Sequence, residues 1–240
     1  MIQLVKKILK KLPLAFTQNQ RYDVQTKRVI KKVFNVDSNG IDIGCHKGEI
    51  FDLFIKHAPK GLHMGFEPIP VLFEALRKKY TSSNHVMYNI ALSNAKELTS
   101  FNYVVSNPSY SGLKKRDYDR KDEVDTSIMV QTDLLDNLLS PEIRIDFIKI
   151  DVEGGELLVL EGAKKIISKW KPVIIFEHGL GASNHYQSTP DKIFALMQEA
   201  GMQIFTMETW LANQKPFSEE EFAKQYYDRL NYYFLAAAKK

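Results

Sequence analysis

The sequence has 240 residues, of which 44% are apolar and 26% charged, values typical of a globular protein rather than a disordered or fibrous one. Its net charge of +4 is far below the positive excess of a nucleic-acid binder, so we expect no nucleic-acid partner. The single cysteine, Cys45, excludes an internal disulfide framework and a cysteine zinc site. No apolar run is long enough to span a bilayer and the amino terminus lacks a secretory signal, so we expect a cytoplasmic protein.

We interpret residues 1–23 as a basic amphipathic arm attached to a single domain. Apolar side chains recur at helical spacing between Ile2 and Leu12, lysines occupy the other side, and Pro13 ends the pattern. Such a helix suits two roles. It packs over the domain with its lysines in solvent, which is the commoner use, or residues 1–12 bind weakly to a membrane surface and make the protein membrane-peripheral.

The domain, residues 24–240, alternates helical and extended patterns. A helix over 24–34 leads into the first strand, and strands and helices then follow in turn. This alternation predicts an α/β fold in which a mostly parallel seven-stranded sheet has helices on both faces. The expected strands are residues 40–43, 62–66, 85–90, 145–150, 173–176, 202–207 and 232–238, and the further helices are 71–80, 156–170 and 218–227, the last with Ser218 as its N-cap.

Residues 93–140 interrupt this alternation. They contain two runs of alternating apolar and polar residues, 98–105 and 126–132, separated by a polar, charged connection. We predict an inserted β-hairpin whose loop covers the substrate. The stretch Ser109–Leu113, followed by Lys114, Lys115 and Arg116, offers aromatic and cationic groups that suit an acidic sugar or a lipid-linked glycan, although a solvated basic loop is an equally good interpretation.

The turn after the first expected strand, in GIDIGCHKG, indicates a nucleotide-like ligand. Gly44 and Gly48 lack the G-x-G-x-x-G spacing that a dinucleotide pyrophosphate requires. A ligand with an adenosine and a small zwitterion but no phosphate fits better, and S-adenosyl-L-methionine is the common one. Gly44 would let the backbone approach this cofactor, Gly48 would open the next helix, and Asp42 would help to anchor the ligand. We expect Cys45 to line the pocket, because a sulfonium methyl transfer needs no covalent enzyme intermediate.

The ends of the next two strands complete the predicted cofactor site. Glu67, in GFEP beside Pro68, is placed to accept hydrogen bonds from both ribose hydroxyls, a role that acids take about twenty residues after such a turn. In NIALS, Asn89, Ala91 and Leu92 are placed to border the adenine. A helix-capping carboxylate at Glu67 and simple packing at Ala91 are the structural alternatives.

The motifs IDIGCHKG, GFEP, NIALS, DFIKIDVEGGE and PVIIFEHG, in this order, resemble the FkbM family of S-adenosyl-L-methionine-dependent methyltransferases over about residues 41–178. The resemblance implies the class I methyltransferase (Rossmann-like) fold and O-methylation of a hydroxyl on a sugar, glycan, glycolipid or natural product, including polysaccharide modification. The sequence has Cys45 and His46 where family members usually have Ala-Asn, so the contact of that asparagine side chain is not carried over, and we expect Cys45 and His46 at the cofactor site. Gly155 replaces the usual alanine.

Methyl transfer to a hydroxyl needs an in-line acceptor and a group that removes its proton. Asp151 and Glu153 follow the fourth expected strand and point the same way if that strand continues, and Glu177 and His178 end the neighbouring strand. We predict Glu153 or His178 as the general base, with Asp151 orienting the cofactor or the acceptor and nearby acids such as Glu177 making a carboxylate more basic.

Two other functions remain open at this point. A nicotinamide-dependent oxidoreductase uses a similar sheet, and a non-catalytic module could retain the S-adenosyl-L-methionine pocket. We expect no metal ion, because the spacing of two acids and His178 is not a recognised ligand set. The expected partner is a small-molecule or glycan acceptor.

Overall fold

A computed structural model describes residues 17–118, 120 and 122–239. The predicted membrane contact of residues 1–12 therefore lies outside the described residues. The first described helix, α2 (Gln18–Val33), begins six residues before the predicted one, because Thr17 and Gln20 form a capping box at its start. Residues 18–23 thus lie in the same helix as residues 24–33, so α2 continues across the boundary predicted at residue 23. Among the described residues, no helix is both long and apolar enough to cross a membrane.

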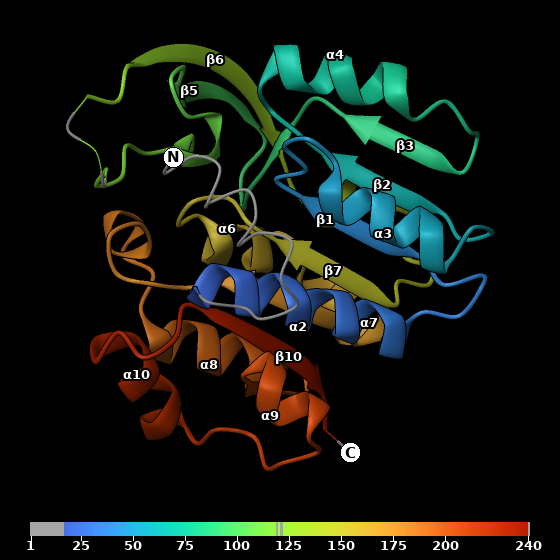
Figure 1. Ribbon diagram of the computed structural model, residues 1–240, viewed down its shortest axis with the longest axis vertical. Coiled ribbons are helices and arrows are strands. Elements are labelled where there is room, and N and C mark those ends of the chain that lie inside the picture. Colours follow the sequence, from blue (N-terminus) through green and yellow to red (C-terminus); the bar gives the residue numbers. More distant parts are fainter. Residues whose placement is uncertain (1–16, 119, 121, 240) are drawn as a thin grey trace, which may run out of the picture.

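The central sheet has seven strands in the order β3-β2-β1-β7-β8-β10-β9, and all but β10 run parallel (Figure 1). This arrangement confirms the predicted fold class. It also brings the carboxyl ends of β1, β2, β7 and β8 to one edge of the sheet. The strands are β1 (Gly40–Ile43), β2 (His63–Phe66), β3 (His85–Tyr88), β7 (Phe147–Ile150), β8 (Val173–Glu177), β9 (Met202–Phe205) and β10 (Tyr233–Ala238).

Helices cover both faces because successive strand residues point to opposite sides. In β7, Phe147 joins the core under one set of helices, while Ile148 and Ile150 join the core under the other. The first set contains α2, α3 (Glu49–His57), α4 (Pro70–Lys79) and α9 (Met207–Leu211). The second contains α5 (Leu135–Leu138), α6 (Glu156–Glu161), α7 (Lys164–Trp170), α8 (Pro190–Glu199) and α10 (Glu219–Tyr227).

One predicted helix is interrupted in the structure, and another begins as predicted. The predicted helix over 156–170 is broken into α6 and α7 around Gly162. A Cβ at Gly162 would lie 2.1 Å from the backbone oxygen of Ser93, so this close approach of the chain requires glycine. The start of α10 is as predicted, since Ser218 and Glu221 form the capping box.

The insertion forms a separate three-stranded sheet that lies beside the carboxyl edge of the main sheet (Figure 1). β5 (Glu97–Val104) and β6 (Asp125–Asp133) form the predicted antiparallel hairpin, and the short β4 (Ala91–Leu92) pairs with β6 in parallel. The third predicted strand therefore ends at Tyr88, and the next residues change sheets. The hairpin loop contains the 3₁₀ helix η1 (Pro108–Tyr110), and a second 3₁₀ helix, η2 (Ser183–Tyr186), follows β8.

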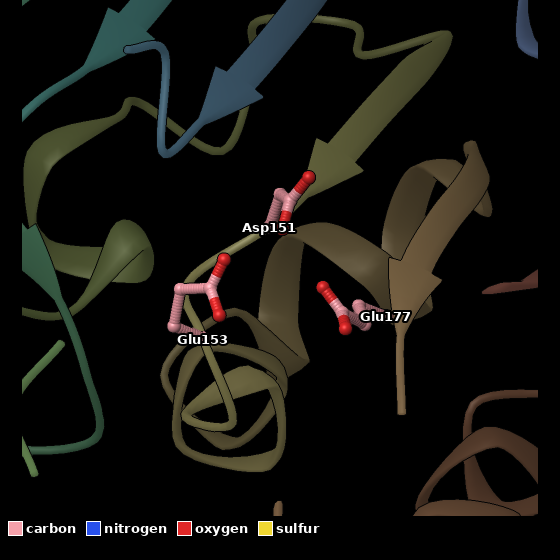
Figure 2. A group of neighbouring side chains, drawn as sticks. All are labelled: Asp151, Glu153 and Glu177. Carbon is pink, nitrogen blue, oxygen red and sulfur yellow. The ribbon is translucent and has the colours of Figure 1, made fainter. Parts of the chain in front are cut away.

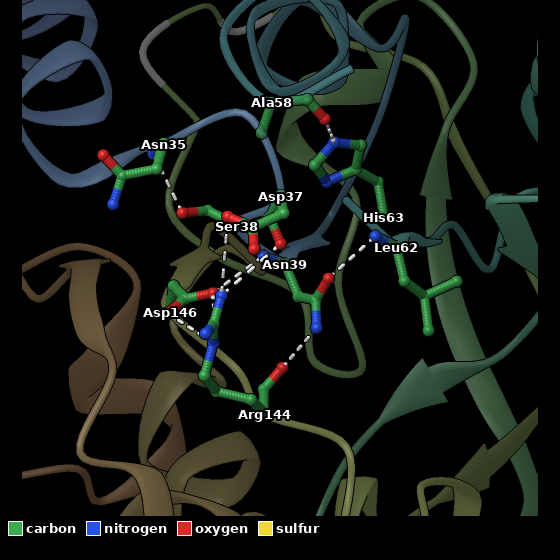
Figure 3. Close-up of polar contacts among 9 residues, drawn as sticks. All are labelled: Asn35, Asp37, Ser38, Asn39, Ala58, Leu62, His63, Arg144 and Asp146. Atoms are coloured by element: carbon green, nitrogen blue, oxygen red, sulfur yellow. Dashed lines mark hydrogen bonds and ion pairs between the residues drawn. The ribbon is translucent and has the colours of Figure 1, made fainter. Parts of the chain in front are cut away.

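A polar cluster ties the strands together at the opposite, amino-terminal edge of the sheet (Figure 3). The Asn39 side chain donates to the Arg144 carbonyl (2.7 Å) and accepts the Leu62 N–H (2.8 Å), while its own N–H donates to Asp146 (2.8 Å). These bonds connect the residues that precede β1, β2 and β7. They fix the start of each strand and hence where the three carboxyl ends lie.

Candidate active site

A cavity of about 850 Å³ opens at the carboxyl edge of the sheet. Its walls come from the segments that follow β1, β2, β7 and β8, from the first turns of α2, and from the hairpin loop. The volume lies in the upper part of the range of about 300–1,000 Å³ for small-molecule sites, so there is room for a cofactor and part of a second ligand.

The glycine turn brings the backbone of β1 against the end of β7. Gly44 lines the cavity with a φ of +80°, and a Cβ there would lie 1.8 Å from the Asp151 carbonyl oxygen. Gly48 opens α3 as predicted, with a φ of +79°, but lies behind the turn and does not line the cavity. Tyr80 holds it there, because its hydroxyl donates to the Gly48 carbonyl (2.9 Å) and to Asp52 (2.7 Å).

Asp42 and Cys45 lie on the cavity wall below this turn. Asp42 is almost fully buried, and burial raises the pKa of its carboxyl to about 7. Its Oδ2 atom has no hydrogen-bond partner among the described residues. Burial raises the pKa of the Cys45 thiol well above its usual range, as expected for a residue that lines the pocket and takes no part as a nucleophile.

Glu67 connects the first two strand ends. Its carboxyl oxygens accept the backbone N–H groups of His46 (2.8 Å) and Ile69 (2.9 Å), and burial raises its pKa to about 7. Ile69 is the N-cap residue of α4, so Glu67 fixes the chain just before this helix and also lies on the cavity wall. His46 lines the cavity too, but its contact to Glu67 is made by its backbone.

Of the residues predicted after β2 and β3 to contact the cofactor, only some line the cavity. Pro68, Ala91 and Leu92 line the cavity. Asn89 does not: its side chain donates to the carbonyls of Glu67 (2.9 Å) and Pro68 (3.0 Å). The prediction of Asn89 at the ligand is therefore corrected, and this residue supports the loop that carries Glu67.

Three of the carboxylates that line the cavity lie close to one another (Figure 2). Asp151, Glu153 and Glu177 each have a carboxyl oxygen within 4.8 Å of the others, a separation at which they could share a metal ion. From the sequence we expected no metal ion, because two acids and His178 are not a recognised ligand set; the structure instead groups three acids, without His178. Two of these already have cationic partners, since Asp151 lies 2.9 Å from Lys149 Nζ and Glu153 forms an ion pair with Arg116.

The pKa values of Asp151 and Glu177 are shifted in opposite directions. Burial by itself would raise the pKa of Asp151, but the Lys149 ammonium and a 2.5 Å hydrogen bond from the Tyr233 hydroxyl hold it below its usual range. Burial and the neighbouring Asp151 carboxylate raise the pKa of Glu177 well above its usual range. Asp151 is therefore ionised at neutral pH, and of the two carboxyls Glu177 is the one that takes up a proton more readily.

Glu153 reaches this group by a turn rather than by strand alternation. β7 ends at Ile150, and Glu153 has a φ of +56°. The buried Glu156 holds the turn, because its Oε1 accepts the N–H groups of Val152 (3.1 Å) and Gly154 (3.2 Å). The predicted direction of Glu153 was thus correct, but the reason given for it was not.

His178 does not reach the cavity. It follows Glu177 directly and so points to the opposite face of the sheet, where its fully buried ring stacks on Tyr226 (4.5 Å between centroids) and Phe222 (6.0 Å). Neither ring nitrogen has a hydrogen-bond partner among the described residues, and burial lowers its pKa to about 3. The prediction of His178 as a general base is therefore wrong.

Several residues of the cavity wall were missed. Tyr22 of α2, Arg229 after α10, and Tyr232 and Tyr233 at the start of β10 all line it. The run NYYF, an aromatic pair at the start of an expected strand, was the available signal. Nothing in the local sequence indicates that an antiparallel strand would bring Tyr233 to Asp151.

The strand order and the site together define a class I methyltransferase fold, with a glycine turn after β1 and an acid after β2. A family model described as the methyltransferase FkbM domain matches residues 42–204, more than half of the sequence. The chain belongs to the FkbM methyltransferase family.

Three solved structures of methyltransferases are similar to this chain, and the first supports the fold. The methyltransferase FkbM from Methylobacillus flagellatus KT is similar with a TM-score of 0.53 and 16% identity, over 85% of this chain and 44% of that one, so this chain spans less than half of that protein's length. A precorrin-6y C5,15-methyltransferase from Geobacter metallireducens GS-15 has a TM-score of 0.43 and 14% identity, over 95% and 91% of the two chains. A TehB-like SAM-dependent methyltransferase from Corynebacterium glutamicum ATCC 13032 Kitasato has a TM-score of 0.42 and 14% identity, over 90% and 88%. No curated protein matches the sequence.

Proposed function

We propose that the protein is an S-adenosyl-L-methionine-dependent O-methyltransferase that acts on a hydroxyl of a sugar, a glycan or glycolipid, or a natural product. The observation that carries the proposal is one cavity, in a chain of the FkbM family, that joins the glycine turn and Glu67 to the carboxylates of Asp151, Glu153 and Glu177. Polysaccharide modification and a cytoplasmic location belong to the same proposal.

The cofactor end of the cavity supports S-adenosyl-L-methionine. The bare backbone at Gly44 allows close approach, and the buried Oδ2 of Asp42, without a partner among the described residues, is available to a hydrogen-bond donor of the ligand. The two oxygens of Glu67 match a ribose diol. When bound, this cofactor supplies a methyl group already activated by a positively charged sulfur. The acids around it suit that positive charge.

The acceptor end supports proton removal by Glu153. Lys149 and Tyr233 keep Asp151 ionised and fixed, and the Asp151 carboxylate raises the pKa of Glu177, so we assign to these two residues the orientation of ligands by hydrogen bonding. Glu153 is left as the carboxylate that accepts the hydroxyl proton. General-base assistance of this kind contributes roughly 10²–10⁴-fold to a rate.

Calorimetry tests the cofactor class. We expect S-adenosylhomocysteine to bind the protein and NADH not to bind. Replacing Glu67 by Gln puts an amide NH₂ against one of two backbone N–H groups, so we expect S-adenosylhomocysteine to bind about 10- to 100-fold more weakly. Glu74→Gln is the matched control, because Glu74 pairs with Arg77 on the exposed face of α4. Binding of NADH in place of S-adenosylhomocysteine would overturn the proposal.

Turnover tests the base. With labelled cofactor and a panel of glycans, sugars and natural-product hydroxyls, Glu153→Gln should lower turnover by about 100-fold or more and leave S-adenosylhomocysteine affinity unchanged. Glu161→Gln is the control, since Glu161 lies at the end of α6 and contacts exposed Asn94. Turnover in Glu153→Gln equal to that of the control would remove Glu153 as the base.

A further inference from the structure

The loop of the inserted hairpin is fastened to the segment after β8, and both segments line the cavity. The Lys114 N–H donates to the Tyr186 hydroxyl (2.7 Å), and the Asp117 N–H donates to the Gly181 carbonyl (3.1 Å). His185 Nε2 lies 3.3 Å from an Asp117 carboxyl oxygen. These contacts lie on both sides of Arg116 in the sequence, so they hold its side chain over the cavity.

Arg116 is the one cation of this loop that faces inward, among the residues that the structure describes there. Three consecutive cations follow Leu113, but Lys115 is 62% exposed and pairs with Asp125 of the hairpin (2.6 Å). The Lys114 ammonium donates outside the cavity to the His185 carbonyl (3.1 Å). Arg116 is only 15% exposed and lines the cavity. Of the three cations that were predicted to cover the substrate, only the largely buried guanidinium of Arg116 lines the cavity.

The guanidinium of Arg116 has donors to spare. It pairs with Glu153 through Nη1, its Nε donates to the Asp117 carbonyl (3.3 Å), and its central carbon lies 4.9 Å from the centre of the Tyr110 ring. A guanidinium carries five N–H groups, and the remaining ones have no acceptor among the described residues. A planar cation with free donors at the wall of a ligand cavity matches the paired oxygens of a carboxylate or a phosphate.

We propose that the acceptor carries an oxyanion, a carboxylate or a phosphate, on the same molecule as the methylated hydroxyl, and that Arg116 binds it. This inference rests on the proposed methyltransferase function and adds a substrate class to it. When Arg116 turns its donors to the acceptor, Glu153 loses its cationic partner and is free to accept the hydroxyl proton. Arg116 is therefore a specificity-determining residue that couples the binding of an anionic acceptor to the release of Glu153 from its ion pair.

A binding experiment with matched sugars tests this inference. The full chain is saturated with S-adenosylhomocysteine and titrated with methyl glucoside, methyl glucuronide or glucose 6-phosphate, which offer no anion, a carboxylate and a phosphate. At least one anionic sugar should bind about tenfold or more tightly than the neutral one, as charge-assisted hydrogen bonds contribute. The preference for one anion over the other identifies the oxyanion.

Variants assign that preference to Arg116. Arg116→Gln should remove the difference in affinity between the anionic and the neutral sugars, whereas Lys115→Gln should keep this difference. Because Arg116→Gln leaves Glu153 unpaired, the double variant R116Q/E153Q, which removes both charges, serves as the folded form if the single variant unfolds. Thermal unfolding of each variant is measured alongside.

Three outcomes overturn the inference: equal affinity of the unmodified protein for anionic and neutral sugars, no detectable binding of any of the three sugars, or a difference in affinity that persists in Arg116→Gln. Its failure is distinguishable from failure of the proposed function. If S-adenosylhomocysteine does not bind, the methyltransferase proposal fails. If it binds and the sugars show no difference in affinity, only the anionic acceptor is excluded.

Discussion

Replacing Gly44 by alanine tests whether the cavity depends on the contact between the glycine turn and the end of β7. At a φ of +80°, an alanine costs about 1–2 kcal/mol in backbone strain. Its Cβ would lie 1.8 Å from the Asp151 carbonyl oxygen, and real Cβ atoms keep at least 3.0 Å, so the turn and the strand end must separate by about 1 Å or more. Overpacking of this kind adds about 1–3 kcal/mol.

We therefore expect Gly44→Ala to lower the free energy of unfolding by about 2–5 kcal/mol. Binding of S-adenosylhomocysteine should weaken by about tenfold or more, since 1.4 kcal/mol of lost contact suffices. Urea denaturation followed by tryptophan fluorescence measures the first quantity, and calorimetry measures the second.

Gly201→Ala is the matched control. Gly201 has a similar φ of +72°, but an added Cβ would meet only the movable end of Lys171, at 3.0 Å. It should cost the strain alone, about 1–2 kcal/mol, and leave ligand binding unchanged. If both variants lose the same stability and Gly44→Ala binds S-adenosylhomocysteine normally, the close approach at Asp151 does not shape the site.

Two further variants probe buried polar groups. His178 has a pKa of about 3 in the folded chain and about 6.5 when unfolded, so acidification below pH 6.5 protonates only the unfolded state, and stability falls by about 1.4 kcal/mol per pH unit. His178→Phe should abolish this effect of His178 on stability. Between pH 7 and pH 5, the free energy of unfolding should therefore fall by about 2 kcal/mol less in the variant than in the unmodified protein, as measured by denaturation at the two pH values. An equal fall in both proteins would contradict the burial of His178. Tyr233→Phe removes a 2.5 Å hydrogen bond to ionised Asp151 and should lower the free energy of unfolding by about 1.5–3 kcal/mol. Tyr232→Phe loses only a hydrogen bond to exposed Asn19 and should change the free energy of unfolding by less than about 0.5 kcal/mol. Equal effects of Tyr233→Phe and Tyr232→Phe would refute the strength assigned to the hydrogen bond between Tyr233 and Asp151.

Local patterns in the sequence were sufficient to predict the sheet, the glycine turn and several residues of the cavity wall. Strand and helix periods differ, and parallel strands must end at a common edge, so Gly44, Glu67 and Asp151 had to come together once the alternation was recognised. Errors arose where a side chain's direction depended on its neighbours. Asn89 turns back to hold the Glu67 loop, and His178 points under α10.

What the sequence by itself determined is the class of fold and the edge of the sheet that carries the site, because both follow from periodicity and from residues a few positions apart. The tertiary structure alone decided the electrostatics of the acid group. Tyr233 reaches Asp151 from β10, and Arg116 reaches Glu153 from an inserted loop. Charge interactions depend on distance and burial, and segments remote in the sequence acquire both only when the chain is folded.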